Sequence, residues 1–376
     1  MRTWHVAAMR VQYTKASRWV ALVVSSTSLL IAGCDKSSSP SSSSPGSSWS
    51  FAVVCDSRSS YATDPAGTTS PYYSGDGTSP YFRNVASALA REEGVELAIF
   101  PGDLIRGKKP TMTGAEMATD LDEWNTNMQP VYDAGIPVYY VRGNHDAYEV
   151  SDPGNGTAAE IWQAHMFQPG EGSNPASGDV VSMDTNPLGG LTTYSFTHKG
   201  SLFLGIDEYP NGASSATGFD AEFVTSTLAT SADHRFAFAH QPVWNFKSDE
   251  LGPAGLADDL QAGKVDLYFS GHVHTYQRIA EAGYRFQEML IGMAGAPQED
   301  PVLVSGGLGG TQYAPDANLT VESYAGGANA NARFGYAVVT VHPDGSLTSV
   351  MKFLDHPTSP ISTVSSFDAA TVTPHP

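Results

Sequence analysis

The stretch VYYVRGNHD, residues 138–146, joins a short apolar run to a cluster of polar side chains. A few consecutive apolar residues followed by turn-forming residues are typical of a buried β-strand. Asn144, His145 and Asp146 stand where this strand would end. Their side chains can bind a metal ion, and the last two can also transfer a proton. The stretch therefore predicts a strand with reactive groups at its carboxyl end.

The same pattern, an apolar run followed by metal-binding side chains, occurs at four other places. The runs and the residues that follow them are 51–55 with Asp56, 97–100 with Asp103, 236–239 with His240, and 267–269 with His272 and His274. In open α/β sheets the binding site lies at the carboxyl ends of the strands. Residues that are far apart in the sequence could therefore converge on one site.

Further elements follow the same alternation of strands and helices. Strands are expected at 202–206 and 289–293, helices at 83–92 and 115–133, and a late hairpin at 336–342 and 347–354. Strands that alternate with helical patterns indicate an α/β architecture. The hairpin adds antiparallel strands.

Composition excludes several classes of protein. The 376 residues are 41% hydrophobic and 16% charged, which is enough apolar content for a core. Disorder, collagen and coiled coil are therefore excluded for the whole chain. The 20 Lys and Arg residues against 39 Asp and Glu residues give a net charge of −19. Because so acidic a surface repels phosphate backbones, we expect no nucleic-acid scaffold as a partner.

The N-terminal residues differ in composition from the rest of the chain. Residues 1–18 carry four basic side chains and no acidic ones, and an apolar run of fifteen residues follows at 19–33. This run is short for a bilayer span and has the length of a signal-peptide core. It ends in IAGC at 31–34, which resembles the bacterial lipobox, whose cysteine carries lipid. We expect an exported lipoprotein of the cell envelope, membrane-anchored through Cys34; an ordinary signal peptide or a retained short anchor is the alternative.

The chain has two cysteines, Cys34 and Cys55, so a lipidated Cys34 would leave no intrachain disulfide. Residues 34–48 are mostly Ser with Pro and Gly, a composition typical of a flexible tether. No internal repeat follows. We therefore expect a signal peptide at 1–33, the tether, one catalytic domain at 49–356 and a C-terminal tail at 357–376.

The polar residues at the strand ends predict a metal centre. Carboxylate, amide and imidazole groups form a ligand set that suits Zn, Mn, Fe or Ni. Two ions a few ångströms apart would share a carboxylate, for which Asp103 is the natural candidate. Taken alone, Asp56 could cap a turn and His240 could be an ordinary buried histidine. The pair His272 and His274 favours a function, because alternate residues beyond a strand rarely both need imidazole.

Taken in order, these residues resemble a known family. The sequence contains Asp56, GD at 102–103, GNHD at 143–146, His240 and GHVH at 271–274. This order resembles the calcineurin-like metallophosphoesterases over roughly 51–295. The octapeptide GHVHTYQR at 271–278 is similar to the form G-H-x-H-x-Y-x-R of the purple acid phosphatase-like branch. The resemblance implies a four-layer αββα sandwich.

The resemblance also implies two divalent or trivalent metal ions, with Mn, Zn and Fe as candidates. The implied ligands are Asp56, Asp103 and His274 for the first ion, and Asp103, Asn144, His240 and His272 for the second. Two positions depart from the family pattern. Arg58 stands where the common branch has a His ligand, and Arg106 stands where purple acid phosphatases have a Tyr. The first ion therefore keeps three of its usual protein ligands, and the purple colour is not expected.

Three residues are expected to act on the substrate. His145 is absent from the implied ligands and would protonate the leaving group, with Asp146 accepting the other ring N–H. Arg58 would bind phosphate oxygens through its planar fork, as could Arg106. For Arg58 a structural ion pair with a neighbouring carboxylate is an open alternative.

Two functions follow from these expectations. The first is a metal-dependent phosphoester hydrolase, a phosphatase or phosphodiesterase, that acts on a small phosphorylated substrate through metal-activated water. The second is a non-catalytic lipoprotein that keeps the fold and binds a metal or a phosphate ligand. The lost His and Tyr ligands favour the second function, whereas the presence of His145 favours the first.

Overall fold

The computed structural model describes ten segments of the chain. They are residues 47–60, 77–107, 110–166, 180–183, 193–209, 218–244, 251–298, 319–325, 333–359 and 361–372. All of them belong to one unit that begins at Pro45. The expected signal peptide, Cys34 and nearly all of the expected tether lie outside the described residues. Within the described segments, no helix is both long and apolar enough for a membrane span.

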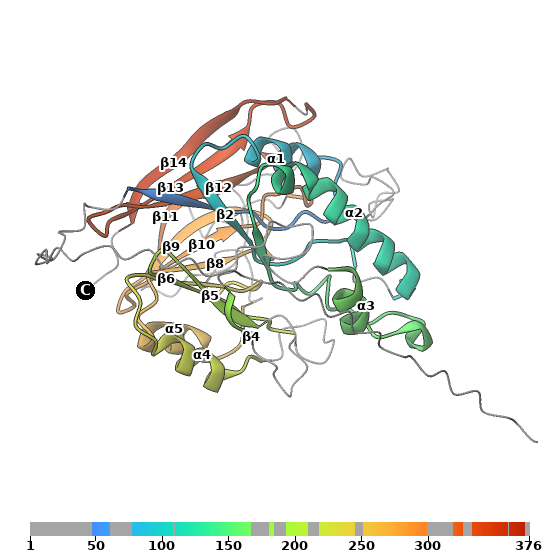
Figure 1. The fold of residues 1–376 in the computed structure, drawn as a ribbon, viewed down its shortest axis with the longest axis horizontal. Helices are drawn as coiled ribbons and strands as arrows, with labels where there is room; N and C mark the ends of the chain where they lie inside the picture. The colour runs from blue at the N-terminus through green and yellow to red at the C-terminus, as the bar shows by residue number, and fades with distance from the viewer. Residues whose placement is uncertain are drawn as a thin grey trace, which may run out of the picture. The chain divides into compact units, whose positions relative to one another are not determined.

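One sheet has six strands in the order β14-β13-β12-β1-β2-β3 (Figure 1). Its strands are β1 (Trp49–Val53), β2 (Val95–Phe100), β3 (Val138–Tyr140), β12 (Gly335–Val341), β13 (Leu347–Leu354) and β14 (Val364–Val372). The first three run parallel to one another. Their carboxyl ends therefore lie at one edge of the sheet, just before Asp56, Asp103 and Asn144 in the sequence.

The other sheet has eight strands in the order β11-β9-β10-β8-β7-β6-β5-β4. They are β4 (Val180–Met183), β5 (Tyr194–His198), β6 (Ser201–Gly205), β7 (Arg235–Phe238), β8 (Leu267–Ser270), β9 (Tyr276–Glu281), β10 (Gln287–Ile291) and β11 (Leu319–Ala325). The central strands β6, β7, β8 and β10 are parallel. His240 follows β7, and His272 and His274 follow β8, so this sheet also presents polar residues at its carboxyl edge.

The described residues form five α-helices and one 3-10 turn. They are α1 (Phe82–Leu89), α2 (Gly114–Asp133), η1 (Pro153–Asn155), α3 (Ala158–His165), α4 (Ala221–Leu228) and α5 (Leu256–Ala262). The longest, α2, begins with a capping box, in which the Thr113 side chain accepts from the Glu116 N–H and the Glu116 carboxylate accepts from the Thr113 N–H. This exchange satisfies backbone donors that the first turn of a helix leaves without partners.

Apolar side chains hold these elements in four layers. Phe51 and Val53 of β1 pack between the two sheets, whereas Ala52 packs with the helices α1 to α3. Successive strand residues face opposite sides, so a strand covered on both sides needs apolar residues throughout. Leu204 and Tyr268 of the eight-stranded sheet pack against α4 and α5. The order helix, sheet, sheet, helix confirms the expected αββα sandwich (Figure 1).

The segment expected as a C-terminal tail at 357–376 contains a strand, β14, at Val364–Val372. β14 pairs antiparallel with β13 and extends the six-stranded sheet. Its Asp368 carboxylate accepts hydrogen bonds from the Tyr276 hydroxyl (2.8 Å) and from Arg278 Nε (2.9 Å), both on β9 of the other sheet. The segment VSSFDAATV is largely exposed, so it lacks the apolar run that marked the other strands. The domain therefore extends at least to Val372.

Candidate metal centre

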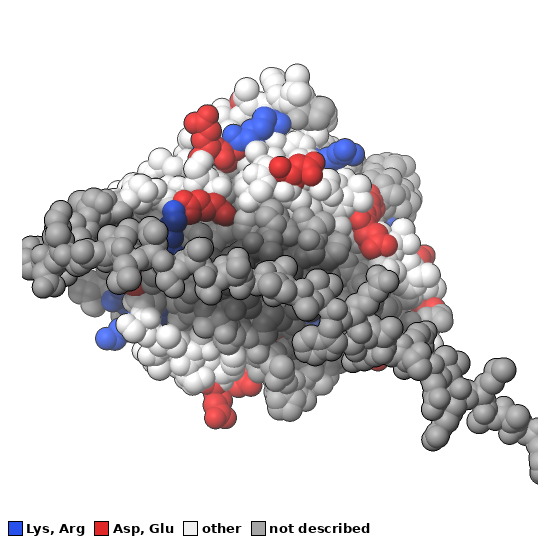
Figure 2. Space-filling view, viewed as in Figure 1, with Lys and Arg blue, Asp and Glu red and all other residues white. Residues whose placement is uncertain are grey.

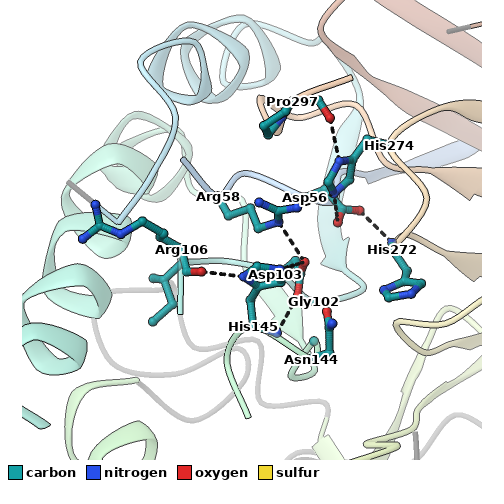
Figure 3. A network of polar contacts seen from close by, with 12 residues as sticks. Asp56, Arg58, Gly102, Asp103, Arg106, Asn144, His145, His272, His274 and Pro297 are labelled. Atoms are coloured by element: carbon teal, nitrogen blue, oxygen red, sulfur yellow. Dashed lines mark hydrogen bonds and ion pairs between the residues drawn. The ribbon is translucent and has the colours of Figure 1, made fainter. Parts of the chain in front are cut away.

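Six side chains from the ends of five strands meet at one edge of the sandwich, and Figure 3 labels all of them except His240. They are Asp56 after β1, Asp103 after β2, Asn144 after β3, His240 after β7, and His272 and His274 after β8. These are the six residues that the sequence predicted as metal ligands. The structure places them together, and their role as ligands stays a prediction.

Backbone strain is concentrated at this edge. Asp56, Asp103 and His272 have positive φ angles of 61°, 51° and 67°. Among the described residues, only two other non-glycine positions, Lys199 and Lys264, share this conformation. Residues held in the left-handed region cluster at functional sites, where the surrounding structure fixes them. At these three residues the backbone leaves the extended conformation of a strand, which changes the direction of each side chain.

The first half of the centre contains Asp56, Asp103 and His274. Each of the three offers one ligand atom, and these atoms all lie within 4.8 Å of one another. His274 Nε2 is 3.4 Å from Asp56 Oδ1, which is buried and has no hydrogen-bond partner among the described residues. His274 Nδ1 donates to the Pro297 carbonyl at 2.6 Å, so the lone pair of the neutral ring lies on Nε2.

The second half contains Asn144, His240 and His272 around the other side of Asp103. His240 Nε2 lies 3.2 Å from Asp103 Oδ1, 3.3 Å from Asn144 Oδ1 and 3.2 Å from His272 Nδ1. His240 Nδ1 donates to the Pro101 carbonyl at 2.9 Å, which again leaves the lone pair on Nε2. The His272 backbone N–H donates to Asp56 Oδ2 at 3.0 Å and so joins the two halves.

The second half fits a metal ion. His240 Nε2 presents its lone pair to two oxygens that also carry lone pairs, a repulsive arrangement unless a cation lies between them. Protonation of the ring is disfavoured, because burial lowers the pKa of His240 despite the Asp103 carboxylate. Imidazole, amide and carboxylate ligands suit Zn, Mn or Fe, as the sequence indicated. The donor set therefore suits a cation placed between His240 Nε2 and the two oxygens.

Asp103 remains an anion at the centre of these contacts. Burial alone would raise the pKa of its carboxyl group, but the Arg58 guanidinium and the His145 backbone N–H help to bring this pKa well below its usual range. Oδ1 faces His240, whereas Oδ2 lies 3.2 Å from Arg58 Nε. The carboxylate thus divides its two oxygens between the two halves. This geometry is the one that a shared ligand requires.

His145 lies over Asp103, with its Nε2 3.9 Å from Asp103 Oδ2. Its Nδ1 donates to the Arg106 carbonyl, and its backbone N–H donates to Asp103 Oδ1 at 3.0 Å. The expectation that Asp146 accepts this ring N–H is therefore wrong. Asp146 is turned away because its carboxylate accepts from the backbone N–H groups of Gly143 and Leu104, at 2.8 and 3.0 Å. Asp146 therefore holds the backbone of two loops in place and does not orient the His145 ring.

The two arginines occupy different places. The Arg58 guanidinium enters the first half, where Nε pairs with Asp103 and Nη2 lies 3.3 Å from His274 Nε2 (Figure 3). Its carboxylate partner is Asp103 rather than Asp56. The Arg106 side chain instead turns toward Asp120 of α2, at 3.8 Å, and away from the ligand atoms (Figure 3). Its contribution to the site is the carbonyl that holds His145.

Sequence reasoning missed three features of the site. The carbonyls of Pro101 and Pro297 orient two imidazoles, and no side-chain pattern marks a carbonyl. Cys55 Sγ lies within reach of Asp56 and His240. It donates to the Gly102 carbonyl at 3.3 Å, and burial together with the Asp56 charge raises the pKa of this thiol well above its ordinary value. In the absence of a bound cation, burial and the neighbouring carboxylate therefore favour the neutral thiol.

Comparison with known proteins agrees with this geometry. The family model described as calcineurin-like phosphoesterase matches residues 62–276, a range that begins after Asp56 and Arg58. A search of curated proteins found no match.

Solved structures with a similar fold include three of different kinds. Purple acid phosphatase PPD1 from yellow lupin (Lupinus luteus) seeds is 14% identical, with a TM-score of 0.57 over 88% of this chain and 55% of that one. PhoD is 12% identical, with a TM-score of 0.57 over 89% and 72%. GAP50, the anchor in the inner membrane complex of Plasmodium, is 16% identical, with a TM-score of 0.51 over 88% and 90%.

At these identities the solved structures support the fold alone, and the chain spans about half the length of the lupin enzyme. The family model is stronger evidence, because it covers more than half of the chain and includes the loops that carry Asp103, Asn144, His240 and the His272–His274 pair. The matched loops are those that the structure gathers into one site. The chain therefore belongs to the calcineurin-like phosphoesterase family.

Proposed function

We propose that the chain hydrolyses the phosphoester bond of a small phosphorylated substrate in a metal-dependent reaction. The observation that carries this proposal is the convergence of Asp103, Asn144 and His272 on the Nε2 atom of His240. Family membership supports the same reaction class. A bound metal ion would supply Lewis acidity, which activates a water molecule and neutralises charge on the phosphoryl oxygens.

The protein's own residues would supply the proton and part of the binding. The Arg106 carbonyl fixes one nitrogen of His145, so the protonated ring directs its other N–H into the site. From there it can protonate the leaving oxygen, a step that general acids typically accelerate by about 10²–10⁴-fold. The Arg58 side chain is 15% exposed, so part of its planar fork can reach a phosphate oxygen.

We further propose that the enzyme works in the cell envelope, tethered through a lipid on Cys34. The lipobox-like IAGC at 31–34 and the Ser-rich stretch after it support this placement. On the described surface visible in Figure 2, Lys and Arg side chains stand among Asp and Glu side chains and do not gather into a patch. Together with the net charge of −19, this favours a small substrate over nucleic acid. Mass spectrometry of the mature N-terminus tests the lipid.

One observation favours the second candidate, a non-catalytic protein that binds a metal or a phosphate ligand. Arg58 occupies contacts of Asp103 and His274 that a first metal ion would use, which favours a site with fewer metal ions than the family pattern implies. A neighbour with this fold, GAP50, is described as an anchor. Under this candidate, phosphate binds at the site but no ester is cleaved.

Hydrolysis of an aryl phosphate with added Mn²⁺ or Zn²⁺ separates the two candidates. We expect turnover that EDTA abolishes and that His145→Ala lowers by about 10²–10⁴-fold with metal content preserved. His165→Ala is the matched control. His165 lies at the end of α3, where it pairs with the exposed Asp122 carboxylate of α2. If metal-loaded protein binds inorganic phosphate but cleaves neither monoesters nor diesters, the binding-protein candidate replaces the enzyme.

A further inference from the structure

The Arg58 guanidinium takes up acceptor atoms that the first metal ion would need. Its Nε lies 3.2 Å from Asp103 Oδ2 and its Nη2 lies 3.3 Å from His274 Nε2. Because His274 Nδ1 already donates to the Pro297 carbonyl, Nε2 can accept the Arg58 N–H. A metal ion binds such atoms at about 2 Å through the same lone pairs. The guanidinium and a metal ion therefore compete for one position.

The backbone around Arg58 holds the side chain toward this position. The Ser57 N–H donates to the Asp103 carbonyl at 3.1 Å, and the Ser59 N–H donates to the Gly77 carbonyl at 2.9 Å. Arg58 itself forms an isolated antiparallel bridge with Thr78. The chain is thus pinned on both sides of Arg58. A long side chain that starts from a fixed backbone loses less entropy when it is ordered.

Charge balance gives the same result. The first half carries the buried carboxylates Asp56 and Asp103, which need a cation nearby. The Arg58 guanidinium supplies one. A divalent ion added beside the guanidinium would be repelled at short range in a poorly solvated site. Among the described residues, the groups around His240 Nε2 in the second half are an amide, a carboxylate oxygen and a second imidazole, and the guanidinium pairs with the other oxygen of that carboxylate.

We propose that Arg58 replaces the first metal ion, so that the centre holds a single metal ion in the second half. The Arg58 guanidinium then acts as a fixed cation on the other oxygen of Asp103. The use of these two cations, the metal ion and the guanidinium, in catalysis rests on the proposed hydrolase function. Their placement in the two halves does not depend on that function. It departs from the two ions that the sequence resemblance implied.

Metal counting tests this inference without any substrate. Purified protein is loaded with Mn²⁺, freed of excess ion and analysed for metal per chain. We expect about one ion per chain in the wild type, with the electron paramagnetic resonance spectrum of an isolated Mn²⁺ ion. Arg58→His removes the guanidinium and supplies an imidazole, so about two ions and an exchange-coupled spectrum are expected. Arg83→His is the matched control, because Arg83 is exposed on α1, and it should keep one ion.

Two variants that each remove one expected ligand show which half holds the ion. They test the proposal even if Arg58→His does not fold. His272→Ala should lose the ion, because His272 belongs to the second half. His274→Ala should keep it, because in our proposal His274 accepts a hydrogen bond from Arg58 instead of binding metal. Two ions in the wild type, or loss of the ion in His274→Ala alone, would overturn the proposal.

The outcomes also separate this inference from the proposed function. A wild type that holds one ion and cleaves no ester would refute the hydrolase and leave the Arg58 assignment standing. A wild type that cleaves phosphoesters with two coupled ions would refute the Arg58 assignment and leave the hydrolase standing.

Discussion

The two halves of the centre differ in what faces their acceptor atoms. In the first half, Arg58 forms an ion pair with Asp103 and its Nη2 lies within hydrogen-bonding distance of His274 Nε2. In the second half, His240 Nε2 faces the oxygens of Asp103 and Asn144, neither of which brings a positive charge. The same residue types therefore indicate a metal ion on one side and an internal cation on the other. A motif predicts where ligands meet, but a neighbouring residue decides which cation they meet around.

The largest effect is expected where the two halves join. Asp103→Asn removes the charge that both halves share, so metal affinity should fall by more than the roughly 10–100-fold typical of lost outer-shell contacts. Turnover should fall with it, while the circular dichroism spectrum stays unchanged. Asp122→Asn, at an exposed carboxylate, is the control. Stoichiometric metal and wild-type turnover in Asp103→Asn would show that the two halves do not share this ligand.

The second half also rests on a buried ion pair behind the ligand residues, between Arg142 and Asp207. Arg142, in the loop that carries Asn144, donates to Asp207 Oδ2 through Nη2 at 2.6 Å and through Nε at 2.9 Å. Asp207 follows β6, so the pair fastens the two sheets beneath the site. Both side chains are almost fully buried. Loss of one partner leaves a buried charge without compensation.

Arg142→Met should therefore lower the free energy of unfolding by about 3–5 kcal/mol, measured by urea denaturation. The double variant Arg142→Met with Asp207→Leu should recover much of this loss, because it removes the stranded charge as well. If the double variant has no higher free energy of unfolding than Arg142→Met alone, the pair stabilises the fold through packing instead of charge.

Much of the fold could be predicted because its central strands are marked by apolar runs. β1, β2, β3, β7 and β8 lie within two residues of their expected positions. Their parallel order could be inferred from the helices between them, which is also why six distant side chains could be expected at one edge. β14 escaped prediction because an exposed edge strand needs no apolar run.

The finer geometry of the site could not be read from the sequence. Asp146 follows His145 directly, yet its carboxylate turns to backbone amides and a distant carbonyl, that of Arg106, holds the ring. Arg58 was open between a phosphate clamp and an ion pair, and its carboxylate partner proved to be Asp103, 45 positions away. Such contacts depend on how loops from different strands pack, which local spacing does not record.

The smallest expected effect concerns a buried carboxyl group behind the second half. Glu288 of β10 accepts from the Trp244 N–H at 2.7 Å and from the Ser270 hydroxyl at 2.5 Å, and so supports the loops that carry His240 and His272. Burial raises the pKa of Glu288 from its ordinary 4.5 to about 8. Glu208, whose pKa burial also raises to about 8, accepts from the Gln241 N–H on the same loop.

A raised pKa in the folded state stabilises the protein at low pH, and this stabilisation is lost as pH rises toward the folded value. For Glu288 the loss runs from about pH 4.5 to about pH 8, because there the folded state keeps a proton that the unfolded chain releases. Glu288→Gln keeps both hydrogen bonds and removes the titration. Between pH 5 and pH 7 the variant should therefore gain about 2–3 kcal/mol relative to the wild type, measured by urea unfolding at each pH. The Glu208 contribution cancels only in part, because burial is the main cause of its raised pKa and the Glu288 charge a minor one. Glu222→Gln, at an exposed position on α4, should show no such trend. A difference that stays constant over this range would mean that Glu288 is ionised in the folded state, and the second half would then rest on a buried anion instead of a neutral acid.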